Sequence, residues 1–75
     1  SNVYAYLRKL ERDVLIVVLN NGDASWRMNV PTHGRLFEGV VLHDLLRGGT
    51  CVVRNRRVRG PALRAHSGTA LWAQL

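Results

Sequence analysis

Residues 13–22 read DVLIVVLNNG, and this stretch decides the fold. Its central part, Val14–Leu19, is continuously aliphatic, yet it is strand-length and far shorter than the roughly 18–20 apolar residues that would span a bilayer. The segment Asn20–Asp23 follows it directly, and an Asn-Gly pair tolerates the positive φ values of tight hairpin turns. The stretch therefore predicts a buried β-strand over Asp13–Asn20 that ends in a hairpin turn.

Outward from this strand, glycines and turn dipeptides divide the chain into short segments. Trp26, Met28 and Val30 alternate with polar residues, the period-2 pattern of a half-buried strand. Pro61 cannot donate to a β-ladder, so we place the segment after it at a sheet edge or bend. The predicted strands are Val3–Lys9, Asp13–Asn20, Ser25–Val30, Gly39–Leu46, Thr50–Arg54, Arg57–Arg59 with an edge segment Pro61–Ala65, and Thr69–Gln74. This pattern predicts an all-β fold, a small antiparallel β-sandwich of about seven or eight strands and Greek-key type.

The 75 residues predict one domain, 1–75, and the apolar content of 47% is that of a globular chain. The chain begins with Ser1-Asn2 and its one methionine is internal, so we expect a fragment of a larger enzyme. Cys51 is the sole cysteine and has no partner for an internal disulfide. A small domain without disulfides favours a reducing compartment, so a cytoplasmic location is expected.

Catalysis and metal binding have no support in the pattern of polar residues. Acid–base hydrolysis of a glycosidic bond needs two carboxylates in one pocket, whereas each acid lies beside a predicted turn. The histidines and the cysteine lack the spacing of zinc ligands, and no glycine-rich phosphate loop opens a helix. The sequence therefore predicts no catalytic residue, no metal ligand and no cofactor-binding residue.

The net charge of +6 raises the question of an anionic partner, and ten of the eleven cationic side chains are arginine. The densest basic cluster is Arg54–Arg59. Single-stranded nucleic acids are usually bound where aromatic side chains lie among the cations, and this cluster contains none. We expect a solvated rim, with neither nucleic acid nor a membrane as partner. A basic nucleic-acid-binding domain, whose affinity would fall steeply with salt, is the least favoured alternative.

The tryptophans carry a further alternative. Trp26 alternates with Met28 and Val30, which favours a place in the core. For Trp72 both orientations stay open, because Leu71 and its alternate neighbours are as apolar as Trp72 and Ala70. An exposed tryptophan could stack on a sugar ring, so a carbohydrate-binding module is the second hypothesis.

The strand over Val14–Leu19 also predicts a contact surface. A strand with one wet face alternates apolar and polar residues, whereas both sides of this one are aliphatic. A two-layer sandwich covers one side, and the other must meet something outside it, unless the loop Pro31–Phe37 folds over it. Exposed apolar patches mark interaction sites, so we expect a partner domain or self-association there. The patch is expected on one of the two sides of the strand, Val14, Ile16 and Val18 or Leu15, Val17 and Leu19, and the candidate docking face is Leu15, Val17 and Leu19. The first strand is expected to extend the exposed patch through Tyr4 and Tyr6 or through Val3 and Leu7.

Four stretches taken together resemble a known family: Val3–Lys9, Val14–Asn21, Leu42–Thr50 and Leu63–Trp72. In order and spacing they resemble the C-terminal β-sandwich domain of the α-amylase family of glycoside hydrolases, of the maltogenic amylase, neopullulanase and cyclomaltodextrinase type. Thr50 departs from the pattern, because an acidic residue after Gly49 is more typical there.

The resemblance implies a non-catalytic role. In that family the catalytic carboxylates lie on a separate (β/α)8 barrel, so no catalytic residue carries over to this chain. The C-terminal domain packs on that barrel and stabilises it, and in some members it is linked to α-glucan binding. The expected partner is therefore the catalytic barrel of the parent chain, with α-glucan as a further expected ligand.

Overall fold

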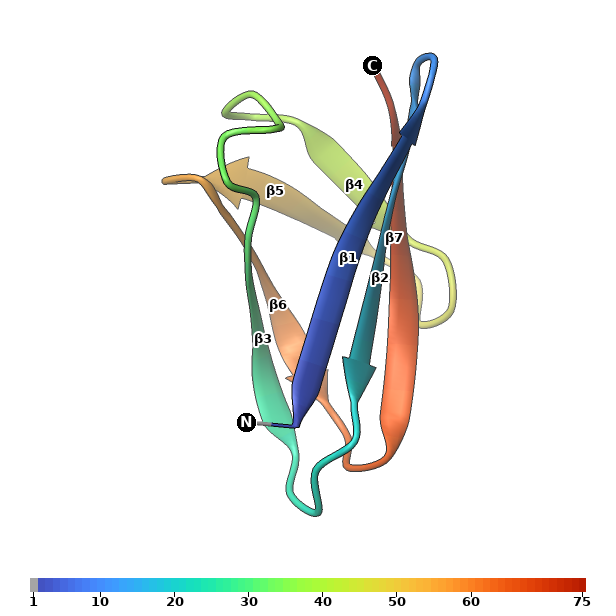
Figure 1. Ribbon diagram of the computed structural model, residues 1–75, viewed down its shortest axis with the longest axis vertical. Coiled ribbons are helices and arrows are strands. Elements are labelled where there is room, and N and C mark those ends of the chain that lie inside the picture. Colours follow the sequence, from blue (N-terminus) through green and yellow to red (C-terminus); the bar gives the residue numbers. More distant parts are fainter. Residues whose placement is uncertain (1) are drawn as a thin grey trace.

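The computed structural model describes residues 2–75, and the described chain folds into seven β-strands (Figure 1). The strands are β1 Val3–Leu10, β2 Asp13–Asn20, β3 Trp26–Pro31, β4 Val41–Asp44, β5 Thr50–Arg54, β6 Arg57–Leu63 and β7 Ser67–Gln74. No helix in this part of the chain is long and apolar enough to cross a membrane. The all-β prediction and the number of strands are confirmed.

All seven strands belong to one nearly closed antiparallel sheet with the order β1-β2-β7-β4-β5-β6-β3. Strands distant in sequence pair with each other, since β7 lies between β2 and β4, and β3 lies beside β6. β5 joins the two halves: its residues 50–52 pair with β4, and its residues 53–54 pair with β6. The sheet is open between β1 and β3.

One local expectation is wrong. Asn20–Asp23 does not form a hairpin, because β2 is followed in sequence by β3 on the far side of the sheet. The buried side chain of Asn20 instead holds this connection: its amide donates to the carbonyls of Ala24 (3.0 Å) and Leu63 (3.0 Å), and its oxygen accepts the N–H of Gly22 (3.0 Å).

Pro61 lies at a bend, one of the two places expected for it, and not at a sheet edge. It lies inside β6, which has β5 and β3 on its two sides and is not an edge strand. The pairing of β3 with β6 shifts register between Arg27 and Asn29, opposite this part of β6. A bulge of this kind is one of the few places where a sheet accommodates proline.

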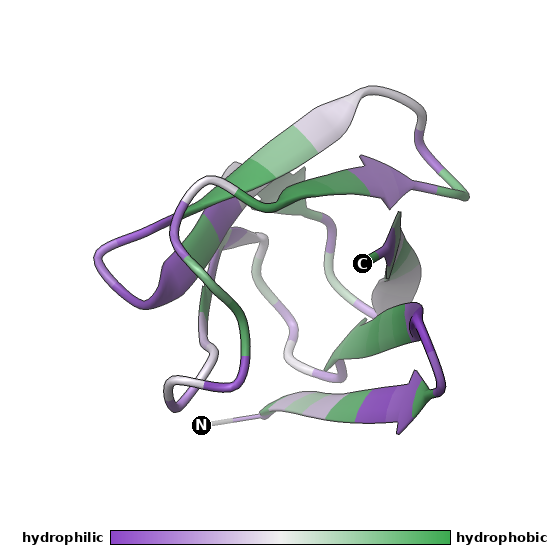
Figure 2. Cartoon of the chain, turned by 90° about the horizontal axis from the view of Figure 1, so that it is seen from above, coloured by the Kyte–Doolittle hydropathy of each residue, from purple (hydrophilic) through white to green (hydrophobic). Residues whose placement is uncertain are grey.

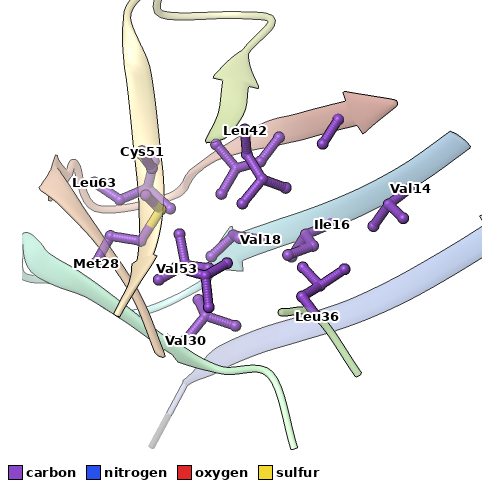
Figure 3. Close-up of a cluster of buried hydrophobic side chains, with 13 residues drawn as sticks. Val14, Ile16, Val18, Met28, Val30, Leu36, Leu42, Cys51, Val53 and Leu63 are labelled. Atoms are coloured by element: carbon purple, nitrogen blue, oxygen red, sulfur yellow. The ribbon is translucent and has the colours of Figure 1, made fainter. Parts of the chain in front are cut away.

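The sheet curves around an interior, seen from above in Figure 2, and the core side chains drawn in Figure 3 fill it. Val14, Ile16 and Val18 of β2 point into it with at most 2% of their surface exposed. Met28 and Val30 of β3 face them from the other half of the sheet. The remaining members are Leu36, Leu42, Cys51, Val53, Val58, Leu63, Leu71 and Ala73. The loop between β3 and β4 therefore contributes Leu36 to the core and does not cover the outer side of β2.

Candidate functional site

The outer side of β2 continues across its neighbours as one apolar surface. Cross-strand pairing sets Tyr6 opposite Val17, and Val17 opposite Ala70 of β7. In the adjacent rows Tyr4 pairs with Leu19, and Leu15 pairs with Trp72. We define the outer face by these residues: Tyr4, Tyr6, Leu15, Val17, Leu19, Ala70 and Trp72.

Exposure on this face is high for such side chains. Tyr4 is 55% exposed, Tyr6 51% and Leu19 39%, whereas Leu15 and Val17 are half-buried. The opposite side of the same strand is in the core, so β2 is apolar on both sides although the sheet covers only one. Of the two extensions through β1 that the sequence left open, the structure puts Tyr4 and Tyr6 on this face, because their cross-strand partners are Leu19 and Val17.

Gly68 shapes one end of the outer face. A Cβ atom at this position would lie 2.7 Å from Leu19 Cδ2 and 2.9 Å from the carbonyl oxygen of Val18. Real side chains essentially never approach so closely, so only glycine lets Leu19 lie against the backbone of β7. The sequence pattern around Gly68 does not reveal this packing role, because the contact spans two strands far apart in sequence.

Trp72 closes the other end. Its indole N–H donates to the Asp13 carboxylate (3.1 Å), and its ring lies 5.9 Å from that of His43. Its neighbours Leu71 and Ala73 are buried. The alternative left open by the sequence is therefore decided: Leu71 and Ala73 face the core, and Trp72 faces outward.

Trp26 has an intermediate position. It is partly buried and packs against the core cluster with Met28 and Val30, as the alternation predicts. It also lines a cleft between β1 and β3. Its ring is thus less enclosed than a core tryptophan, because β3 is an edge strand with no neighbour beyond it.

Asp44 anchors the turn between β4 and β5. Its carboxylate accepts the backbone N–H of Arg47 (2.9 Å), the Thr69 hydroxyl and the Arg47 Nε–H (2.8 Å). Burial alone raises the pKa of Asp44, but the hydrogen bonds from Thr69 and Arg47 outweigh it and hold the pKa below its usual value. Arg47 also donates to the carbonyls of Pro61 and Ala62. All these partners of Asp44 and Arg47 lie within the chain, so the network stabilises the fold.

Glu38 likewise stabilises a turn, the one between β5 and β6. Its carboxylate accepts the backbone N–H groups of Asn55 (2.7 Å) and Arg56 (3.1 Å), at the turn where both residues have positive φ. These two hydrogen bonds lower the pKa of Glu38, and the one from Arg56 has the larger effect. The carboxylates of Glu38 and Asp44 are thus committed to separate turns.

Other polar residues are dispersed over the fold. No group of three or more potential metal ligands occurs within residues 2–75. His66 pairs with Asp23 (2.9 Å) at the surface, and Cys51 lies in the core, where burial raises the pKa of its thiol. Within the basic cluster, the guanidinium of Arg57 donates to the amide oxygen of Asn29 (3.0 Å).

A family model described as the neopullulanase-like C-terminal domain matches residues 1–73. No curated protein matches the chain. Among solved structures, an α-amylase from Anoxybacillus, described as representing a new glycosyl hydrolase subclass, is similar with a TM-score of 0.76 and 16% identity. The match covers 97% of this chain and 16% of the amylase chain, and at this identity it shows a shared fold.

Proposed function

Because the chain belongs to the family of neopullulanase-like C-terminal domains, we propose that it is a non-catalytic domain of an α-glucan-acting glycoside hydrolase. In this proposal it packs through its outer face on the catalytic barrel of the parent chain and stabilises that barrel. The chain spans only 16% of the similar amylase, in keeping with a small accessory unit of a larger enzyme.

The observation that carries the proposal is the outer face itself. It joins aromatic and aliphatic side chains from β1, β2 and β7. Asp13 borders it at one end, where it accepts the Trp72 indole N–H. Val17 is at its centre, flanked by Tyr6 and Ala70 in the adjacent strands. Patches of this kind on folded domains mark contact surfaces, and packing against a second domain would remove these side chains from water.

A matched pair of variants tests the docking role. Val17 of β2 and Val52 of β5 are both half-buried valines in strands, and β5 lies three strands from β2 in the sheet. Val17→Asp in the complete parent enzyme should lower its thermal midpoint and loosen the domain, measured by limited proteolysis. Val52→Asp should do neither beyond the loss that each variant shows in the 75-residue chain. Equal effects of both variants in the parent would contradict the proposal.

One observation supports a second role, α-glucan binding. Tyr4 and Tyr6 are two residues apart on one strand, so both rings lie on the same face, and each is more than half exposed. Aromatic surfaces of this kind suit sugar rings. Affinity electrophoresis of the 75-residue chain in maltodextrin gels, with Tyr4→Ala and Tyr6→Ala as controls, tests it. Retardation that both variants abolish would favour glucan binding over docking as the use of this face.

A further inference from the structure

The two strands that border the open side of the sheet, β1 and β3, run in the same direction. Each of the six pairings along the order β1-β2-β7-β4-β5-β6-β3 is antiparallel. Six reversals leave the two terminal strands, β1 and β3, parallel to each other, as Figure 1 shows. Direct closure would therefore need a parallel pair. One additional strand, antiparallel to both, would close the sheet as an eight-stranded antiparallel barrel.

The backbone of β1 is arranged to accept such a strand. The N–H of Asn21 donates to the carbonyl of Asn2 (2.9 Å), which makes these residues a hydrogen-bonded pair in the β1–β2 register. Hydrogen-bonded and non-hydrogen-bonded pairs alternate along an antiparallel ladder. The backbone N–H and C=O groups of Ala5 and Leu7 are consequently directed away from β2, toward the open side.

The edge of β3 follows the same rule. The N–H of Thr32 donates to the carbonyl of Arg56 (3.0 Å), so Val30 and Val58 form the next hydrogen-bonded pair of the β3–β6 register. The backbone groups of Asn29, which precedes Val30, are therefore directed away from β6. Pro31, which follows Val30, directs its carbonyl the same way but has no N–H to donate. Exposed strand edges of this kind are templates for strand addition.

A cleft of about 530 Å3 lies between the two edges. Leu7, Ile16 and Val30 contribute apolar side chains to it, and Trp26 lines it where β3 begins. Arg35 lines it beyond the end of β3 and also shares a smaller hollow with Leu7 and Lys9. Asn29, Thr32 and His33 add polar groups on the β3 side. The cleft is thus mostly apolar and cationic at one end, and none of its lining residues is acidic.

We propose that this cleft binds an extended acidic peptide of another protein by strand addition. The peptide would run antiparallel to β1 and β3, with its apolar side chains on the core. Its N-terminal half would lie at the cationic end, because β1 ends beside Lys9 and β3 ends before Arg35. Acidic residues in that half complement Lys9 and Arg35. A second copy of the chain is disfavoured as occupant, since each copy carries a net charge of +6.

The probe is a synthetic peptide of about eight residues, a usual strand length, acetylated and amidated at its ends. It alternates valine with glutamate in the first half and valine with threonine in the second. The reversed sequence has the same composition with the acids at the other end. Binding is followed by the fluorescence of Trp26 in the Trp72→Phe chain, so that the signal comes from the cleft. The forward peptide should bind saturably, and the reversed peptide at least about fivefold more weakly.

Two variants separate strand addition from general attraction. Ala5→Pro removes an N–H that is directed toward the cleft and leaves the β1–β2 ladder intact, so it should weaken binding at least tenfold. Arg35→Glu should weaken the glutamate peptide at least about fivefold and leave unchanged a version with glutamine in place of glutamate. If Ala5→Pro fails to fold, the reversed peptide and Arg35→Glu still test whether the peptide binds in the cleft in the proposed direction.

Three results would overturn the proposal. The first is the absence of saturable binding. The second is equal binding of forward and reversed peptides with no effect of Arg35→Glu. The third is a dimer in analytical ultracentrifugation that Ala5→Pro converts to a monomer, which would identify a second copy as the occupant. Tyr6 borders both the cleft and the outer face, but none of these measurements changes Val17, so docking on the catalytic barrel is tested separately by Val17→Asp.

Discussion

Replacing Asp44 by asparagine tests whether the buried carboxylate holds the two halves of the sheet together. The side chain is 3% exposed and its two oxygens receive hydrogen bonds from the turn, from Thr69 of β7 and from the Arg47 guanidinium. Asparagine has the same shape but only one accepting oxygen. Its NH2 group would face the Arg47 Nε–H, and two donors cannot bond each other.

The expected loss follows from the burial of the two partners. Removing one partner of a buried ion pair costs about 3–5 kcal/mol, but Arg47 is 25% exposed, so water compensates part of the loss. A hydrogen bond to a charged group is worth about 1.5–3 kcal/mol. Arg47 cannot swing away freely, because it also holds the carbonyls of Pro61 and Ala62. We expect Asp44→Asn to cost about 2–3 kcal/mol, a large part of the ~3–5 kcal/mol that such a small core supplies.

Urea denaturation followed by tryptophan fluorescence measures this loss. With an m-value of about 1 kcal/mol/M, the midpoint should fall by about 2–3 M. Asp23→Asn is the matched control, because Asp23 is an exposed carboxylate with an exposed His66 partner, and its midpoint should stay unchanged. A shift below about 0.5 M for Asp44→Asn would refute the reasoning and make the network dispensable.

The pH dependence gives an independent check. The pKa of Asp44 is lowered in the fold, so its ionised form stabilises the folded state fully above the ordinary aspartate pKa of about 3.9. That stabilisation is lost as the pH falls through the lower folded value. The difference in unfolding free energy between the original chain and Asp44→Asn should therefore be largest near pH 7 and shrink below about pH 4.

Three further variants test packing and surface exposure, each by the same urea midpoint. Gly68→Ala should cost about 1–3 kcal/mol because its Cβ would meet Leu19 and backbone; an unchanged midpoint would show that β7 shifts freely. Trp26→Ala should cost about 2–3 kcal/mol, less than for a fully enclosed tryptophan because Trp26 is only partly buried. The double change of Arg56 and Arg57 to serine should cost no more than ~0.5 kcal/mol, because the hydrogen bond from Arg57 to Asn29 is exposed to solvent. A larger loss would contradict their place on a solvated rim.

Much of the fold was predictable because local pattern specifies strands. The run over Val14–Leu19 and the alternation from Trp26 to Val30 each gave a strand at the observed place. The turn residues after Asn20 wrongly predicted that β2 pairs with the next strand, β3. The Asn-Gly pair predicts a hairpin, but the buried Asn20 side chain binds carbonyls as distant as that of Leu63, and it carries the chain to the other edge of the sheet. A contact across 43 positions leaves no mark in a local pattern.

The sequence alone determined that β2 is aliphatic on both sides and that one of them lies outside the core. It could not determine which, because Val14–Leu19 has no polar residue to mark the wet side. The tertiary structure decided this through pairing: Ile16 lies opposite Leu71, and Val14 opposite Ala73, and all four side chains are in the core. The same register turns Trp72 outward beside Leu15. Side-chain direction in a sheet is fixed by the neighbouring strand, and that neighbour lies more than fifty residues away in the chain.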